Sequence, residues 1–289
     1  MQAANTAVNG RDAAKRGNKR AMLKAFVHIA VWLPACSMLA DLYLGRMGML
    51  PAQSVVYWTG VWATALLLLT LAITPLRHLL RWNAIVQSRR IIGVAALAYT
   101  VAHVVAFLVL HGWSFAHIWT EMTTRATLIV ASISMLGLMA LGATSTDAAV
   151  SRLGAENWRR LHGFNLLITG LAVLHYMMSP GTFDTQYLMA GFFFWLCAWR
   201  LLARNGTPPG AAGLAGLALA SVLFVGSFEF GWQALHKRLA LRDTYEDLII
   251  NFDDGLPSIW IVMIVSIGVA LVALFGQQRA ASLRRTKSR

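Results

Sequence analysis

Eight long apolar runs dominate this sequence, and short polar or basic segments separate them. A helix needs about 20 apolar residues to cross the hydrocarbon core of a bilayer. Inside lipid, only helices and closed barrels satisfy every backbone polar group. The runs therefore predict an all-α fold, a polytopic membrane helix bundle of about eight transmembrane helices. We place the spans near residues 23–44, 57–77, 90–111, 126–145, 160–179, 185–204, 211–232 and 257–276.

The composition agrees with a membrane protein, because 57% of the residues are hydrophobic and only 13% are charged. A net charge of +13 would suggest nucleic-acid binding in a soluble chain, but here the basic residues mark the ends of apolar runs. With the N-terminus inside, 20 of the 25 Lys and Arg residues fall on the cytoplasmic side. The positive-inside rule then predicts that both termini are cytoplasmic. Cys36 and Cys197 both lie in apolar runs, which argues against disulfide and iron–sulfur chemistry.

The spacing of polar segments predicts three parts. Residues 1–22 are expected to be a mobile basic cytoplasmic tail, and residues 23–205 a six-helix domain. Residues 206–289 are expected to add two transmembrane helices, an outer loop at 233–256 and a basic tail. In that loop the basic residues come first and the acidic residues later, which suits a docking surface for a soluble partner; a solvated connector is the alternative.

Histidines interrupt two of the apolar runs. His103 lies 13 residues after Arg90, and His175 lies 15 residues after Arg160. At 1.5 Å per residue, both lie about 20–22 Å along their helices from a basic anchor. An unpaired imidazole in lipid is costly, and two at one depth can clamp an iron porphyrin from both faces. A single histidine would more simply bridge to a backbone or hydroxyl partner; for the depth-matched pair we favour heme.

His162 occupies a different position from the other two histidines, because it lies only two residues beyond Arg160, at the cytoplasmic edge. On an ideal helix it is about 140° away from His175. Its counterpart on the third span falls near Arg89, which cannot ligate iron but binds carboxylates and phosphates. A second, inner heme therefore lacks its second ligand. The competing interpretation is an anionic group near Arg89 and Arg90, such as a flavin phosphate or a heme propionate.

The other patterns exclude more than they indicate. We find no catalytic triad, phosphate-binding loop or Rossmann glycine fingerprint, and intramembrane acids are nearly absent. His111 and His117, near the outer end of the third span, are interpreted as surface residues. The pattern is typical of an electron relay without a complete substrate active site, so whether the chain is itself an enzyme stays open. The alternative is a heme-free transporter or scaffold whose histidines only bridge helices.

Several short motifs lie in and beside the apolar runs. They are I-T-P-L-R (73–77), S-R-R-I-I-G (88–93), His103, T-S-T-D-A-A (144–149), L-G-A-E-N-W-R-R-L-H (153–162) and L-H-Y (174–176). In this combination they are specific, and they resemble the ferric-reductase-like transmembrane family, most closely its bacterial MsrQ (YedZ) branch. The resemblance covers roughly residues 24–205. That branch is the heme-binding membrane subunit of the periplasmic protein-methionine-sulfoxide reductase system.

The resemblance implies that residues 23–205 bind b-type heme through His103, His162 and His175. It associates Arg89 and Arg90 with flavin mononucleotide (FMN). It also implies a bacterial inner-membrane protein that takes electrons on the cytoplasmic side, from quinol or a flavin reductase. The expected acceptor is a periplasmic reductase subunit of the molybdopterin type. Residues 206–289 have no counterpart in the short members of that family.

Overall fold

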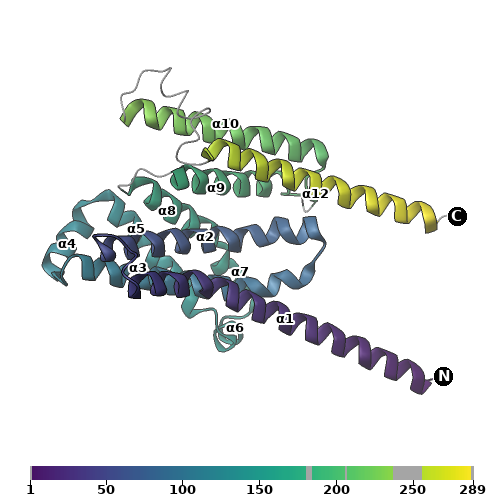
Figure 1. Ribbon diagram of the computed structural model, residues 1–289. Coiled ribbons are helices and arrows are strands. Elements are labelled where there is room, and N and C mark those ends of the chain that lie inside the picture. The colour runs from purple at the N-terminus through teal and green to yellow at the C-terminus, as the bar shows by residue number, and fades with distance from the viewer. Residues whose placement is uncertain (1, 180–183, 206, 237–255, 288–289) are drawn as a thin grey trace. The chain divides into compact units, whose positions relative to one another are not determined.

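The computed structural model describes residues 2–179, 184–205, 207–236 and 256–287, which form helices joined by turns (Figure 1). The helices are α1 (Gln2–Tyr43), α2 (Pro51–Leu80), η1 (Asn83–Gln87), α3 (Ser88–Leu110), α4 (Phe115–Thr124), α5 (Ala126–Ala143), α6 (Asp147–Leu153), α7 (Ala155–Gly163), α8 (Asn165–Met178), α9 (Asp184–Leu202), α10 (Ala211–His236) and α12 (Ser258–Lys287). No strand occurs in these ranges. Most of the predicted outer loop lies outside the described residues.

The predicted fold class is confirmed, because the chain is a polytopic membrane helix bundle. Within the described residues, six helices are long and apolar enough to cross a membrane: Gly17–Tyr43, Pro51–Leu80, Asn83–Leu110, Ala126–Ala143, Ala155–Met178 and Ala211–Trp232. The other two predicted spans are also helical. One is α9, and the other corresponds to the shorter apolar helix Ser258–Leu274. The orientation of the termini stays a prediction.

Helix boundaries differ from the predicted spans at several places. Helix α1 begins at Gln2, so residues predicted as a polar tail continue the first membrane helix. The expected span 160–179 is not one uninterrupted helix, because α7 ends at Gly163 and α8 begins at Asn165. The interruption is the single residue Phe164, whose backbone stays in the right-handed helical region (φ −66°, ψ −9°). Helices α4 and α6 were not predicted, and only the end of α7 falls in a predicted span, because these sequences are too short or too polar to stand out as spans.

The chain divides into two compact units. Unit 1 comprises Met1–Ile73, Asn83–Glu121 and Met135–Gly163, and unit 2 comprises Thr74–Trp82, Met122–Ser134 and Phe164–Arg289. His103 and His162 belong to unit 1, together with Arg89 and Arg90, whereas His175 belongs to unit 2.

In unit 1, helix α3 packs against α1, α2 and α5. The Tyr99 hydroxyl donates a hydrogen bond to the Val31 carbonyl of α1 (3.0 Å), and the Tyr99 ring stacks on Trp32. On another side of α3, a Cβ on Gly142 of α5 would lie 2.3 Å from Leu97 Cδ2. The hydrophobic effect does not hold helices together in lipid, so membrane helices depend on close van der Waals packing. Small residues at the crossings allow the backbones to approach closely enough for that packing.

In unit 2, α9, α10 and α12 pack together and α8 packs against α9. Gly191 of α9 is the closest approach, since a Cβ there would lie 2.3 Å from Val225 Cγ2 of α10 and 3.2 Å from Val262 Cγ2 of α12. Both valines are almost fully buried. A second glycine, Gly226 on α10, faces Ile259 of α12 in the same way. Glycines thus set the close packing of this helix trio.

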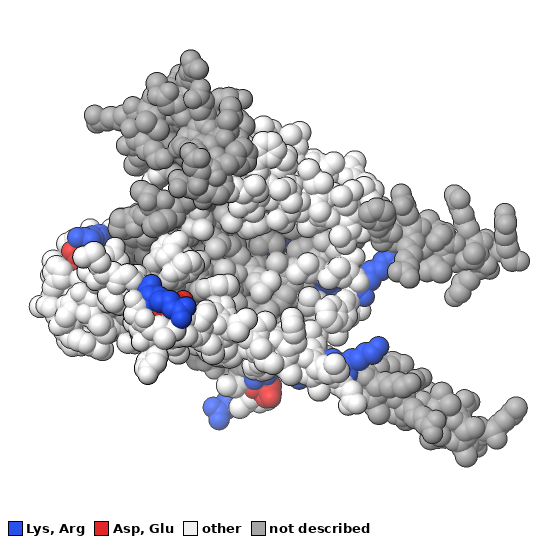
Figure 2. All heavy atoms as spheres, in the orientation of Figure 1, with Lys and Arg blue, Asp and Glu red and all other residues white. Residues whose placement is uncertain are grey.

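Large apolar side chains cover much of the surface, as expected for helices that face lipid. Val101, Val105, Ile133 and Leu136 are all exposed although they lie in membrane-length helices. The face in Figure 2 is accordingly mostly white, and the described charged side chains form a few small groups. A soluble protein rarely exposes such continuous apolar surface.

Candidate functional site

His103, in the second half of α3, is held by a backbone carbonyl of the neighbouring helix α2. Its Nδ1 lies 2.8 Å from the Val56 carbonyl oxygen. A carbonyl oxygen can only accept, so Nδ1 carries the proton and Nε2 carries the lone pair. The Thr59 hydroxyl lies 3.4 Å from the same Nδ1 but already donates to α2 carbonyls. The ring is therefore fixed in the tautomer that can bind a metal through Nε2.

A glycine makes room for this ring. A Cβ on Gly60 of α2 would lie 3.1 Å from both Cε1 and Nδ1 of His103. That separation is tighter than an ordinary van der Waals contact. Any larger residue at this position must displace the imidazole or α2, so Gly60 belongs to the His103 site although it carries no chemistry of its own.

His175, near the end of α8, repeats the arrangement in unit 2. Its Nδ1 donates to the Thr127 carbonyl of α5, at 3.1 Å, so Nε2 again carries the lone pair. The backbone carbonyl of His175 accepts a hydrogen bond from the Ser179 hydroxyl (2.8 Å), which secures the end of the helix. Histidines that bind metals usually donate their other ring N–H to a carbonyl or carboxylate. Both histidines thus fit an axial ligand to iron.

His162 is held differently. Its Nε2 lies 3.2 Å from Thr144 Oγ1, and that hydroxyl donates to the Ala140 carbonyl at 2.8 Å. With that proton donated to Ala140, Thr144 Oγ1 accepts from His162 Nε2–H, whereas in the other tautomer it donates to Nε2. The imidazole also stacks on Trp158, with ring centroids 4.0 Å apart, and Trp158 Nε1 donates to the Thr144 carbonyl. Ligation through Nε2 would have to break the bond to Thr144.

The two arginines open helix α3. Both side chains are exposed, and Arg90 Nη1 contacts Asp147 Oδ1 at 2.5 Å. Asp147 is 95% exposed at the start of α6, and an exposed ion pair of this kind contributes only about 0–1 kcal/mol. Beside them, Ser88 is buried and its hydroxyl has no hydrogen-bond partner within the described residues. Arginines and a buried hydroxyl at a helix N-terminus suit an anionic oxygen group.

The structure thus adds residues that sequence analysis missed. The Val56 and Thr127 carbonyls carry no residue-type signal, since every backbone offers one. Asp147, Thr144 and Trp158 all lie in the motif segments 144–149 and 153–162, so their roles could have been sought there.

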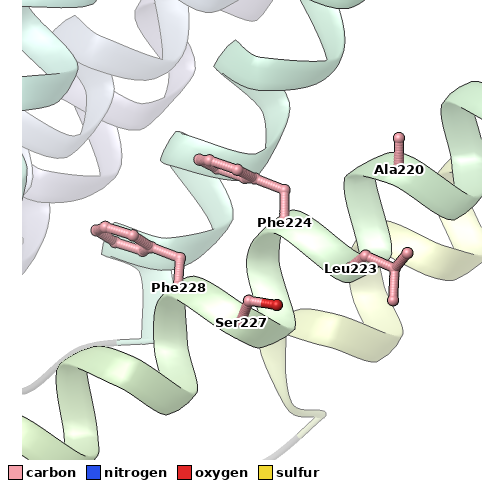
Figure 3. A pocket seen from close by; sticks show the side chains of 5 residues that line it. All are labelled: Ala220, Leu223, Phe224, Ser227 and Phe228. Atoms are coloured by element: carbon pink, nitrogen blue, oxygen red, sulfur yellow. The ribbon is translucent and has the colours of Figure 1, made fainter.

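An apolar hollow of about 470 Å³ lies on α10, and none of the residues that line it is titratable (Figure 3). Its walls are Ala220, Leu223, Phe224, Ser227 and Phe228, and the Phe224 and Phe228 rings stack along the helix. It is widely open, so it suits a lipid chain better than a polar substrate.

Comparison with known proteins places the chain. Residues 59–174 match the family described as ferric reductase like transmembrane component. The protein-methionine-sulfoxide reductase heme-binding subunit MsrQ of Herminiimonas arsenicoxydans is 30% identical over 203 residues, 66% of this chain and 92% of that protein. The MsrQ of Cronobacter sakazakii is 34% identical over 181 residues, 62% of this chain and 90% of that protein. The chain belongs to the MsrQ family.

Another MsrQ, from Xanthomonas axonopodis pv. citri, is 36% identical over 176 residues, 57% of this chain and 80% of that protein. No solved structure gives a significant match. The segment that matches the ferric-reductase family contains Arg89, Arg90, His103 and His162, and it ends one residue before His175. Helices α9, α10 and α12 follow the segment that matches the ferric-reductase family.

Proposed function

We propose that this chain is a membrane electron-transfer subunit that holds b-type heme between His103 and His175. The observation that carries the proposal is that both histidines hydrogen-bond through Nδ1 to a backbone carbonyl. His103 bonds to the carbonyl of Val56, and His175 to that of Thr127. The names of the MsrQ relatives, which call them heme-binding subunits, support the same cofactor. When bound, heme supplies a one-electron couple. The pairing of the two histidines rests on their matched depth along the sequence.

The chain's own residues would tune that couple. The two carbonyl acceptors keep each imidazole neutral, oriented and more basic, which strengthens ligation and favours ferric iron. The apolar helices around them exclude water and lower the local dielectric constant, so nearby charges would interact more strongly with the heme iron. His162 stays a candidate ligand of a second iron, although its Nε2 is engaged by Thr144.

We propose electron entry on the cytoplasmic side, from quinol or a flavin reductase. Exit would be to a periplasmic methionine-sulfoxide reductase catalytic subunit of the molybdopterin type. The relatives' names support the reductase partnership. The location would be a bacterial inner membrane with both termini inside, with residues 206–289 as an addition to the heme-binding domain 23–205. Arg89 and Arg90 would hold FMN or another anionic group at the entry side, and their place at the start of α3 beside the buried Ser88 supports this.

A heme-free scaffold is the competing function, because a bond to a carbonyl also satisfies a purely structural histidine. A visible spectrum of purified protein, oxidised and dithionite-reduced, separates the two. We expect a sharp reduced Soret band and a narrow α-band, typical of low-spin heme with two nitrogen ligands. Protein that is folded yet takes up no heme, even when expressed with excess heme precursor, would establish the scaffold instead.

A further inference from the structure

Helix α4 follows α3 after a short turn (Figure 1). A second group of ligand-type side chains lies at this turn. We name it the α3–α4 cluster: His111, His117 and Glu121. One ligand atom of each residue lies within 4.8 Å of the others. His111 immediately follows α3, whereas His117 and Glu121 are four residues apart on α4 and so share one helix face. All three belong to unit 1.

The turn between the helices brings the residues together. Gly112 and Trp113 both adopt a φ of 58°, a left-handed conformation that reverses the chain directly after His111. For a tryptophan this conformation costs about 1–2 kcal/mol. The Trp113 N–H donates to the Leu108 carbonyl and the Ser114 N–H to the His111 carbonyl, so the turn is closed by its own backbone.

A hydrogen bond to α3 sets the tautomer of His111. Its Nδ1 donates to the Phe107 carbonyl of the preceding helical turn, at 2.9 Å, which leaves Nε2 unprotonated. The Phe107 ring packs against the His111 imidazole at a centroid distance of 4.1 Å, and the His117 ring stacks on the same imidazole at 5.8 Å. Histidines that bind metals usually make such a hydrogen bond from the other ring nitrogen to a carbonyl. His111 makes this bond although it is not one of the proposed heme ligands.

We infer that the α3–α4 cluster binds a divalent transition metal of the Zn²⁺ type. Two imidazole nitrogens and one carboxylate are a known zinc ligand set that leaves a fourth position for water. Ligand atoms in such a tetrahedral shell lie about 3.4 Å apart, given bonds of about 2.0–2.1 Å. The three ligand atoms already lie within 4.8 Å of one another, and His117 is exposed, so its side chain has room to rotate toward the other two ligands. Hard oxygen-preferring cations such as Mg²⁺ fit two imidazoles poorly.

Bound metal would tie the start of α4 to the end of α3. His111 follows His103 by eight residues, about 12 Å along the helix axis. The cluster is therefore separate from the proposed heme ligands. If the cluster proves not to bind metal, the proposed heme function is unaffected.

The test is metal binding to the full-length protein in detergent, purified without a histidine tag and freed of metal with a chelator. Zn²⁺ is titrated against a chromophoric competitor, and Co²⁺ reports geometry through its visible d–d absorption. We expect one tight Zn²⁺ per chain and a tetrahedral Co²⁺ spectrum. His117→Ala and Glu121→Gln should each weaken Zn²⁺ binding at least about 10-fold, since each removes one of three protein ligands.

The matched control is His28→Ala, which removes an exposed histidine of the same unit outside the cluster and should bind Zn²⁺ as the wild type does. Circular dichroism confirms that each variant is folded, whatever its heme content. If folded Glu121→Gln and His117→Ala both bind Zn²⁺ with wild-type affinity, the inference is wrong. It is equally wrong if the wild type binds no stoichiometric Zn²⁺.

Discussion

At the residue scale, Gly60 lies against the ring of His103, one of the two proposed heme ligands. We expect Gly60→Ala to push the His103 ring away from the Val56 carbonyl, because the added methyl would lie 3.1 Å from two ring atoms. Loss of such a supporting hydrogen bond typically weakens metal binding about 10-fold to 100-fold. Heme dissociation to apomyoglobin would measure the change.

Gly93→Ala is the control for that change. Gly93 is also a glycine in a membrane helix of unit 1, but a Cβ there would lie 4.0 Å from its nearest neighbour, an ordinary contact. It should keep wild-type heme affinity. Equal heme retention in both variants would mean that Gly60 does not position His103.

The histidines and arginines of the candidate site could be predicted from the sequence, because ionisable residues inside or beside apolar runs stand out. Their hydrogen-bond partners could not, since Val56 and Thr127 act only through backbone carbonyls. Gly60 was also missed, because a glycine in an apolar helix gives no hint of which side chain it faces. For His162 the sequence suggested a metal ligand, and only the structure adds its bond to Thr144 and its stacking on Trp158.

At the scale of single helices, the N-terminus of α3 is the proposed anion site. We expect Arg89→Ala to lower flavin content about 10-fold or more, the effect of losing a charge-assisted hydrogen bond, while the heme stays bound. Extracted flavin and heme are quantified from the same preparation. Asp147→Asn is the control, because it removes the partner of Arg90 and leaves both arginines in place. Wild-type protein without flavin, or Arg89→Ala with a full complement, would refute the flavin assignment.

The packing of α9 against α10 and α12 supplies a second test at this scale. A methyl on Gly191 would lie 2.3 Å from Val225 and cannot be accommodated without a shift. We expect Gly191→Ala to destabilise the protein by about 1–3 kcal/mol, the usual cost of overpacking. Gly216→Ala on α10, where a Cβ meets nothing within 4 Å, should be neutral or slightly stabilising. Indistinguishable thermal unfolding of the two variants would contradict this packing.

The existence of the helices was more predictable than their ends. A run of apolar residues marks the part of a helix that lipid can cover, but polar flanks can continue the helix, as they do in α1 and α2. No proline marks the break between α7 and α8, and Gly163 is the only helix-breaking residue at that point of the sequence. Short amphipathic helices such as α7 lack the length that makes a span recognisable.

At the scale of the whole molecule, the distribution of basic residues predicts orientation. Alkaline phosphatase gains activity only when exported, because it needs disulfides. We expect activity when it is fused after Gly48, in the turn between α1 and α2, and none when it is fused after Arg289. A fluorescent protein that folds only in the cytoplasm should give the opposite pattern. Phosphatase activity at the C-terminus would overturn the proposed topology, and with it the direction of electron flow.

The pairing of His103 with His175 is tested most directly by the spectra of two single variants, His103→Ala and His175→Ala. Because six-coordinate, low-spin iron needs both imidazoles, each variant should lose the low-spin spectrum, and added imidazole should restore it by filling the vacated position. His28→Ala should change nothing. Full wild-type spectra in both single variants, without added imidazole, would contradict the proposal that these two histidines hold the heme.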